Sequence, residues 1–172
     1  MIILFEGPDG TGKTTIARNR VNKLIDDKKT CLFFHCTSTS GGKSADEDYS
    51  KFLEELKHFK ERGFDVVIDR AWVSNIVYTE VYEPGKAHIS EKLAEELFKI
   101  VDHTIICLPE DKEKYMQHFT KLSEARHEDY VENMDKIYDK FNEFAKRFTR
   151  YDMFKHITDK PENLQLEDII ND

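Results

Sequence analysis

The sequence predicts an α/β fold in which a parallel sheet is covered by helices on both faces. Short apolar runs with the length of buried strands alternate with longer segments whose apolar residues recur at helical spacing. Such alternation is typical of parallel sheets, because each crossover between parallel strands needs a connection about as long as a helix. The 172 residues show no repeat and no linker. We therefore expect one domain over residues 1–172, with three α/β/α layers and a five-stranded parallel sheet.

The individual elements follow from this periodicity. Apolar runs predict strands at 2–6, 31–36, 65–69, 104–108 and 151–157. Helical spacing predicts helices at about 13–27, 46–62, 90–101, 110–121 and 129–148, a helical or turn-like segment at 72–82, and a short helix after Pro161. Gly63 is a stop signal for the helix at 46–62. Pro84-Gly85 ends the segment at 72–82, and Ser90 is an N-cap, without a capping box, for the helix at 90–101.

Composition excludes several classes of function. With 34 acidic and 26 basic residues the formal net charge is −8, so the chain is a poor candidate for binding duplex DNA. The apolar run at 1–5 is much shorter than the roughly 20 residues of a membrane-spanning helix, and charged residues follow it at once. We therefore expect neither a membrane segment nor a signal peptide. The three cysteines lack metal-ligand spacing and fit buried free thiols in a reducing cytoplasm.

A glycine-rich loop carries the strongest functional signal. Residues 7–14 read Gly-Pro-Asp-Gly-Thr-Gly-Lys-Thr and match G-x-x-x-x-G-K-[ST] between a predicted strand and a predicted helix. The glycines let backbone N–H groups turn inward onto phosphate oxygens, while Lys13 adds charge at the β- and γ-phosphates and Thr14 offers a hydroxyl to Mg²⁺. We expect a nucleoside triphosphate to bind through Gly7, Asp9, Gly10, Thr11, Gly12, Lys13, Thr14 and Thr15.

Asp69 and Arg70 form a second constellation at the end of the third predicted strand. Ligands of open α/β sheets bind at this carboxyl edge, so we expect both residues beside the glycine-rich loop. A carboxylate there can hold Mg²⁺, and an arginine can bridge donor and acceptor phosphates. The structural alternative is a surface ion pair at a strand end. Asp9 fits either a contact with a sugar hydroxyl of the acceptor or a turn-stabilising role in an Asp-Gly pair.

Three segments together resemble the thymidylate kinase family. Residues 5–15, FEGPDGTGKTT, resemble its opening FEGxDGxGKTT, and Asp69-Arg70 with Ser74 and Tyr78 resemble its DR(Y)xxSxxAYQ segment. Residues 125–128, Ala-Arg-His-Glu, look like the D-R-x-E of its lid, which would lie at about 121–130. The resemblance covers nearly the whole chain and implies a P-loop NTPase-type fold with a small helical lid.

Thymidylate kinases transfer the γ-phosphate of ATP to a deoxynucleoside monophosphate with Mg²⁺. Carried over by position, the catalytic residues would be Lys13, Asp69, Arg70 and Arg126, and the metal would be held by Thr14 and Asp69. The acceptor would be bound by Asp9, Tyr49, Phe52, Arg70, Trp72, Ser74 and Tyr78. Tyr49 and Phe52 compete for the place on the base, and Phe52 alone fits the apolar face of its helix.

The sequence also departs from the family pattern. Ala71 stands where the family has an aromatic residue, Thr79 replaces the glutamine that meets the thymine, and Ala125 replaces the lid aspartate. These changes leave the base open among thymine, another pyrimidine and a modified base. With the short chain, they fit a compact viral or phage relative, which would act in the host cytoplasm. The resemblance is also compatible with a homodimer.

Other P-loop functions remain alternatives at this point. A GTPase is disfavoured because N-K-x-D is absent, and so is a D-x-x-G after a later strand. A deoxynucleoside kinase would want a carboxylate base after the second strand, and residues 34–38 contain none. A nucleic-acid end or base kinase would favour a basic groove, which the charge argues against. The intact Lys13, Thr14, Asp69 and Arg70 argue against an inactive nucleotide-binding regulator. We expect small-molecule nucleotides as partners, without nucleic acid or membrane.

Overall fold

The computed structural model describes residues 1–36, 45–86, 89–109, 111–122, 128–147 and 153–156. These residues form a five-stranded sheet in the order β2-β3-β1-β4-β5, with every neighbouring pair parallel. The strands are β1 (Ile2–Glu6), β2 (Cys31–His35), β3 (Asp65–Asp69), β4 (His103–Cys107) and β5 (Met153–His156). The predicted α/β class with a parallel sheet is therefore confirmed. The bounds of β1 and β3 are as predicted, and those of the other strands differ by one or two residues.

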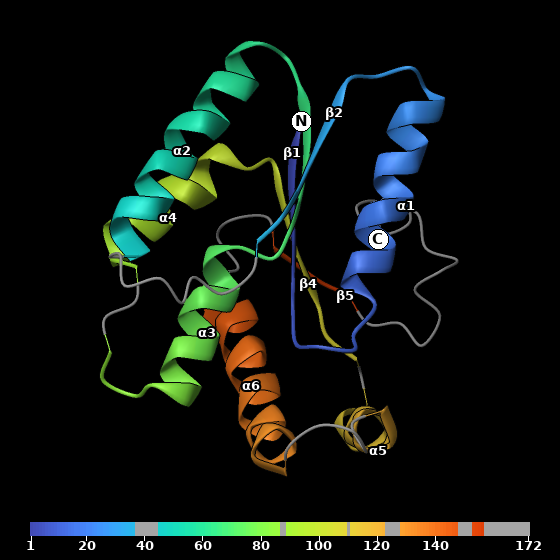
Figure 1. The fold of residues 1–172 in the computed structure, drawn as a ribbon, viewed down its shortest axis with the longest axis vertical. Coiled ribbons are helices and arrows are strands. Elements are labelled where there is room, and N and C mark those ends of the chain that lie inside the picture. The colour runs from blue at the N-terminus through green and yellow to red at the C-terminus, as the bar shows by residue number, and fades with distance from the viewer. Residues whose placement is uncertain (37–44, 87–88, 110, 123–127, 148–152, 157–172) are drawn as a thin grey trace.

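Helices cover both faces of the sheet (Figure 1). They are α1 (Lys13–Asp26), α2 (Ala45–Glu61), α3 (Trp72–Tyr82), α4 (Glu91–Ile100), α5 (Lys112–Leu122) and α6 (Glu128–Arg147). On one face, Ile16, Ala17 and Leu24 of α1 pack against the sheet in a small apolar cluster. On the other face, α2, α3, α4 and α6 share a larger cluster. All five residues of β1 are buried, as expected for a central strand covered on both sides.

The predicted lid lies only partly within the described residues. Helices α5 and α6 end and begin at its two sides, and residues 123–127 between them lie outside the described part. The predicted short helix after Pro161 lies outside it as well. Within the part of the chain that the structure describes, no helix has both the length and the apolar character needed to cross a bilayer.

Gly63 ends α2 as the sequence predicts, with a positive φ of 73°. The N–H of Gly63 donates to the carbonyl of Lys60, and the N–H of Phe64 donates to the carbonyl of Phe59, each over 3.1 Å. This pair of bonds is the Schellman arrangement, in which a residue with left-handed backbone closes the helix. The chain then enters β3 directly, so Gly63 fixes how α2 leads into the strand that carries Asp69.

Asp102 joins three segments at the amino end of the sheet. Its Oδ2 accepts a hydrogen bond from the backbone N–H of Ile2 over 2.7 Å, and its Oδ1 accepts one from Lys60 Nζ over 2.8 Å. Burial alone would raise the pKa of Asp102, but the bonds from Lys60 and Ile2 outweigh it and lower that pKa. The ionised carboxylate thus stabilises the fold at neutral pH.

We expect Asp102→Ala to reduce the free energy of unfolding by about 1–2 kcal/mol at pH 7, because the buried N–H of Ile2 loses this acceptor. Asp102→Asn keeps an acceptor for Ile2 and should reduce the free energy of unfolding by less.

The stabilisation by Asp102 should also depend on pH. Since the pKa of Asp102 is lowered in the folded protein, the stabilisation is complete above the ordinary carboxyl pKa of 3.8 and is lost as the pH falls through the folded value. Urea unfolding at pH 7 and near pH 3 measures both effects. An alanine deficit of equal size at both pH values would contradict the role of the charge.

Candidate active site

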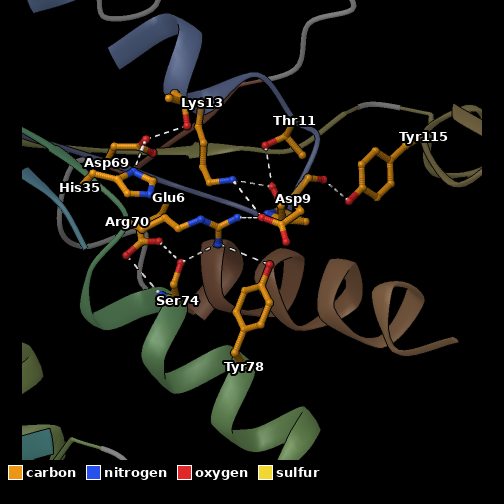
Figure 2. Close-up of polar contacts among 12 residues, drawn as sticks. Glu6, Asp9, Thr11, Lys13, His35, Asp69, Arg70, Ser74, Tyr78 and Tyr115 are labelled. Carbon is orange, nitrogen blue, oxygen red and sulfur yellow. Dashed lines mark hydrogen bonds and ion pairs between the residues drawn. The ribbon is translucent and has the colours of Figure 1, made fainter. Parts of the chain in front are cut away.

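The carboxyl ends of three neighbouring strands bring the predicted site residues together (Figure 2). Phe5 of β1 and His35 of β2 both stand opposite Asp69 of β3 in the parallel register. β1 runs into the glycine-rich loop and β3 runs into Arg70, so both meet at this edge. The hydroxyl of Thr14 donates to Asp69 Oδ2 over 2.6 Å. The loop and the Asp69-Arg70 pair therefore lie in direct contact, as the strand order predicted.

The backbone of the loop depends on its glycines. Gly7 has φ +143°, and a Cβ atom built on it would lie 2.3 Å from the carbonyl oxygen of Cys107. Gly10 and Gly12 have φ values of 76° and 79°, a conformation that side chains disfavour. Gly12 directly precedes α1, so the N-terminus of that helix opens into the loop. A helix N-terminus with inward-turned N–H groups is suited to binding an anion.

Gly7→Ala should destabilise the fold by about 3–5 kcal/mol, because a strained φ and overpacking against the β4 backbone act together. Gly63→Ala is the matched control, since Gly63 also has a positive φ but a Cβ there meets nothing within 4 Å. Gly63→Ala should reduce the free energy of unfolding by about 1–2 kcal/mol, because only the left-handed backbone is unfavourable there. Urea denaturation of both variants measures the difference. Equal losses would mean that the loop can move aside for the methyl group.

Lys13 is a buried cation within this loop. Its Nζ donates to the carbonyl of Pro8 over 2.8 Å and lies 3.9 Å from Asp9 Oδ1. Burial, and then the charge of Arg70, lower the pKa of Lys13 to about 8. A desolvated ammonium group is costly, and an anion beside it would relieve that cost. Thr11 closes the same turn, with its hydroxyl donating to Pro8 over 2.9 Å, whereas the predicted loop member Thr15 is exposed.

Asp69 has the features of a cation ligand. Its side chain is fully buried, and Oδ2 accepts hydrogen bonds from Thr14 and from His35 Nδ1. Oδ1 is buried and has no hydrogen-bond partner among the described residues. A buried carboxylate oxygen without a partner carries a desolvation cost that a cation can offset. Mg²⁺ typically takes one or two protein oxygens together with substrate phosphates, and the Thr14 hydroxyl and the Asp69 carboxylate fit that pattern.

Arg70 is held from several sides in an unusual backbone conformation. Its φ is +66°, in the left-handed region, and its N–H donates to the carbonyl of Phe5 over 2.9 Å. Its Nη1 donates to the hydroxyls of Ser74 and Tyr78, each over 3.3 Å, and its Nη2 pairs with Asp9 Oδ1. Burial alone would lower the pKa of Arg70, but the Tyr78 hydroxyl and Asp9 outweigh it and raise that pKa. The guanidinium is thus a fixed positive charge.

Glu6 supports this arrangement and was missed in the sequence. It is fully buried, and its Oε1 accepts hydrogen bonds from the N–H groups of Ala71 and Ser74 over 2.7 and 3.2 Å. Its Oε2 accepts the Ser74 hydroxyl. Burial raises the pKa of Glu6 despite these bonds. Glu6 therefore satisfies the first N–H groups of α3 and fixes Ser74, which in turn contacts Arg70. The available signal was an acidic residue at the end of a fully apolar strand.

A pocket of about 260 Å³ opens beside Arg70, and we call it the Arg70 pocket. Its lining residues are Asp9, His35, Cys36, Tyr49, Arg70, Ala71, Ser74, Asn75, Tyr78 and Thr79. Five predicted acceptor-binding residues are among them, namely Asp9, Tyr49, Arg70, Ser74 and Tyr78. Burial raises the pKa of Tyr78 to about 12, so its hydroxyl keeps its proton at neutral pH and can donate a hydrogen bond. His35, Cys36 and Asn75 are lining residues that the sequence did not reveal.

Two predicted acceptor-binding residues are not at this pocket. Trp72 is fully buried in the core, with its ring edge-on to Phe98 at a centroid distance of 5.5 Å. Phe52 packs edge-on against Phe34 at 5.5 Å and joins the core instead of the pocket. The prediction for Trp72 is wrong because the start of α3 turns this side chain inward. Of the two competing aromatic residues on α2, it is Tyr49 that lines the pocket. Arg126 lies outside the described residues.

Tyr115 of α5 is a second contact that sequence reasoning missed. Its hydroxyl donates to the backbone carbonyl of Asp9 over 2.6 Å, and its ring lies 5.7 Å from that of Tyr138 on α6. The Tyr138 hydroxyl donates to the carbonyl of Pro109 over 2.6 Å. α5 is thus attached to the loop that carries Asp9, and α6 contacts α5 through Tyr138.

Comparisons of sequence point to one family. A putative thymidylate kinase of Acidianus bottle-shaped virus is 24% identical over 126 residues, which is 73% of each chain. The thymidylate kinase of Mycoplasmopsis agalactiae is 48% identical over 61 residues, or 36% of this chain and 27% of that protein. The chain is thymidylate kinase-like. No protein-family model matches it.

Solved structures agree with this thymidylate kinase-like fold. The YorR protein of Bacillus subtilis, solved with phosphorylated GDP, aligns with a TM-score of 0.63 and 17% identity, covering 99% of this chain and 92% of YorR. The thymidylate kinase of Ehrlichia chaffeensis aligns with a TM-score of 0.53 and 17% identity, covering 94% of both chains. At this identity the alignments show the fold alone. They show a similar fold over nearly the whole chain.

Proposed function

We propose that the chain is a nucleotide kinase that transfers the γ-phosphate of ATP to a deoxynucleoside monophosphate, with dTMP or a related pyrimidine nucleotide as acceptor. One observation carries the proposal: Thr14 of the glycine-rich loop contacts Asp69, and the adjacent Arg70 points its guanidinium into a pocket. A loop suited to a triphosphate and a pocket suited to an acceptor thus meet at one strand end. The names of the relatives support a thymidylate kinase-like activity, and the P-loop NTPase type of fold suits it.

The ATP site would use the glycine-rich loop, Lys13 and a bound Mg²⁺. Backbone N–H groups at residues 7–13 and the start of α1 would hold the triphosphate, and the buried Lys13 would lie at its β- and γ-phosphates. Thr14 and Asp69 would hold Mg²⁺. When bound, the ion neutralises phosphate charge and orients the γ-phosphoryl group. The Thr14 oxygen would use a lone pair for the ion, and its hydrogen can stay on Asp69.

The acceptor side would use the Arg70 pocket. Arg70 would lie between the two phosphates and stabilise the negative charge that spreads over the transferring group. A phosphate oxygen of the acceptor bonds to the γ-phosphorus as the bond to the β-γ bridging oxygen breaks, and ADP leaves with that electron pair. No general base is needed, because the attacking oxygen is already anionic. Asp9 would reach the acceptor sugar, Tyr49 the base, and Arg126 of the lid would close on the reacting phosphates.

A deoxynucleoside kinase fits the pocket less well. Such an enzyme needs a free carboxylate to take the proton of the 5′-hydroxyl. Asp9 is the acidic residue among the pocket lining, and it pairs with Arg70. Glu6 is buried under α3 and is occupied by Ala71 and Ser74. Asp9 and Glu6 are therefore engaged by a cation and by α3, which favours an acceptor that is already charged.

A coupled ADP-release assay with ATP and Mg²⁺ tests the proposal. The acceptor panel holds each deoxynucleoside monophosphate, GMP, hydroxymethyl-dUMP, the free nucleosides and a short oligonucleotide, with Lys13→Ala protein as the blank. GMP and dGMP are included because YorR was solved with a phosphorylated guanine nucleotide. We expect turnover on pyrimidine monophosphates and none on nucleosides. Turnover only on nucleosides or the oligonucleotide would overturn the proposal, and turnover on purine monophosphates alone would overturn its pyrimidine part.

A further inference from the structure

His35 has no part in the function proposed above, yet it contacts the centre of the site. It is the last residue of β2 and stands opposite Asp69 in the parallel register. Its Nδ1 lies 2.8 Å from Asp69 Oδ2, while 46% of its side chain is exposed (Figure 2). The same residue lines the Arg70 pocket. A half-exposed polar ring is thus hydrogen-bonded to a fully buried carboxylate.

The hydrogen bonds of Asp69 are divided unevenly between its two oxygens. Oδ2 takes both described side-chain donors, the Thr14 hydroxyl at 2.6 Å and the His35 ring at 2.8 Å. Oδ1 takes none among the described residues, although it is buried. The carboxylate is therefore oriented by bonds to one oxygen, which leaves the other available. Because a carboxylate oxygen accepts, the bond requires that His35 Nδ1 carry its hydrogen.

The two donors on Oδ2 have different roles at a cation site. The Thr14 hydroxyl can ligate a divalent cation through an oxygen lone pair while its hydrogen stays on Asp69, so Thr14 is itself a candidate ligand. The His35 bond comes from another strand, and His35 is not assigned a place at the cation. Among the described contacts, His35 is therefore the side chain that orients the Asp69 carboxylate without being a candidate ligand.

We propose that His35 is a positioning residue, which holds the Asp69 carboxylate in the orientation that binds the divalent cation of the nucleotide complex. The inference rests on the proposed function, because it assumes that Thr14 and Asp69 hold that cation. Outer hydrogen-bond partners of metal ligands typically contribute 10–100-fold to metal affinity. His35 would act through this bond, without touching the cation itself.

Two substitutions of His35 by amide side chains test the hydrogen bond to Asp69 apart from the other properties of the ring. In His35→Asn the side-chain amide occupies the place of Nδ1 and can still donate to Asp69. In His35→Gln the amide is one methylene farther out, near the place of Nε2, so the same chemical group misses the carboxylate. His35→Asn is thus the conservative variant, and His35→Gln is its matched counterpart.

The test uses the full chain with Mn²⁺ as the probe metal and ADP as the nucleotide, at fixed pH. Electron paramagnetic resonance of free Mn²⁺ gives the metal affinity of the ADP complex, and calorimetry with EDTA gives the metal-free affinity for ADP. We expect His35→Gln to weaken Mn²⁺ binding by about 10-fold or more. His35→Asn should stay within about threefold of the parent, because the donor to Asp69 is kept. ADP binding without metal should be unchanged in both.

Three results would overturn the inference. They are parent-like Mn²⁺ affinity in His35→Gln, an equal loss in His35→Asn, and a parallel loss of metal-free ADP binding in His35→Gln. The assay contains no acceptor, so it distinguishes this inference from the proposed function. Intact Mn²⁺-ADP binding in a parent that phosphorylates no monophosphate would overturn the proposed function alone. A parent that binds no Mn²⁺ with ADP would overturn both the inference and the metal part of that function.

Discussion

Lys13→Ala is expected to abolish measurable turnover, with a loss of at least about 10³-fold in kcat/KM for ATP. Lys13 lies in the phosphate loop, where burial has already removed much of the hydration of its ammonium group. A desolvated charge interacts strongly with a phosphate, so the loss should exceed that of a surface lysine. Arg18→Ala is the control, because Arg18 is an exposed cation on the same helix. Initial rates with saturating acceptor measure both variants, and near-parent activity in Lys13→Ala would remove the phosphate-loop interpretation.

Replacing Lys13 should raise the stability of the ligand-free protein, although it abolishes turnover. The pKa of Lys13 is lowered from 10.5 to about 8, so the unfolded chain binds more protons between these values. Parent stability therefore rises with pH from about 8 to 10.5, and below pH 8 the buried charge destabilises the fold by roughly 3 kcal/mol. Lys13→Met should accordingly be more stable than the ligand-free parent at pH 7, by an amount that shrinks toward pH 10.5. Urea unfolding across this range checks the sign, and a less stable Lys13→Met at pH 7 would contradict it.

The loop and its neighbours could be predicted because their determinants are local or topological. Residues 7–14 match G-x-x-x-x-G-K-[ST] between an apolar strand and a helix, and this spacing in this context identifies a phosphate loop. Asp69 and Arg70 could be placed beside the loop because parallel strands end at one edge. The structure adds the direct contact between Thr14 and Asp69, which the sequence implied only through this shared edge.

The residues that were missed depend on contacts that sequence spacing does not encode. The bond from His35 to Asp69 spans 34 positions, and the bond from Tyr115 to Asp9 spans 106. Trp72 was misplaced because its position in the chain does not say which side of α3 faces the core. In the structure, Glu6 binds the N–H groups of Ala71 and Ser74 at the start of the helix, and Trp72 packs into the core.

Arg70→Ala is expected to lower kcat by about 10³-fold while the affinity for ATP stays within a few-fold of the parent. The guanidinium lies at the acceptor pocket and contacts Ser74, Tyr78 and Asp9, with no described bond to the glycine-rich loop other than the one to Asp9. Its charge should therefore matter when the phosphoryl group moves, more than when ATP binds. Single-turnover rates and calorimetry with a non-hydrolysable ATP analogue measure the two quantities separately. Loss of ATP binding would instead make Arg70 a donor-site residue.

Arg70→Lys tests whether a positive charge at this position is sufficient for activity. The lysine ammonium keeps the charge but lacks the planar fork that lets Arg70 bond to Ser74 and Tyr78 through Nη1 and to Asp9 through Nη2. We expect Arg70→Lys to recover less than about 10-fold of the activity lost in Arg70→Ala, since an unfixed charge is placed less accurately. Tyr78→Phe removes one of these contacts and leaves the guanidinium, so it should reduce kcat far less than either variant. Full activity in Arg70→Lys would show that the fork has no role, and the contacts of Arg70 would then serve the fold of α3 alone.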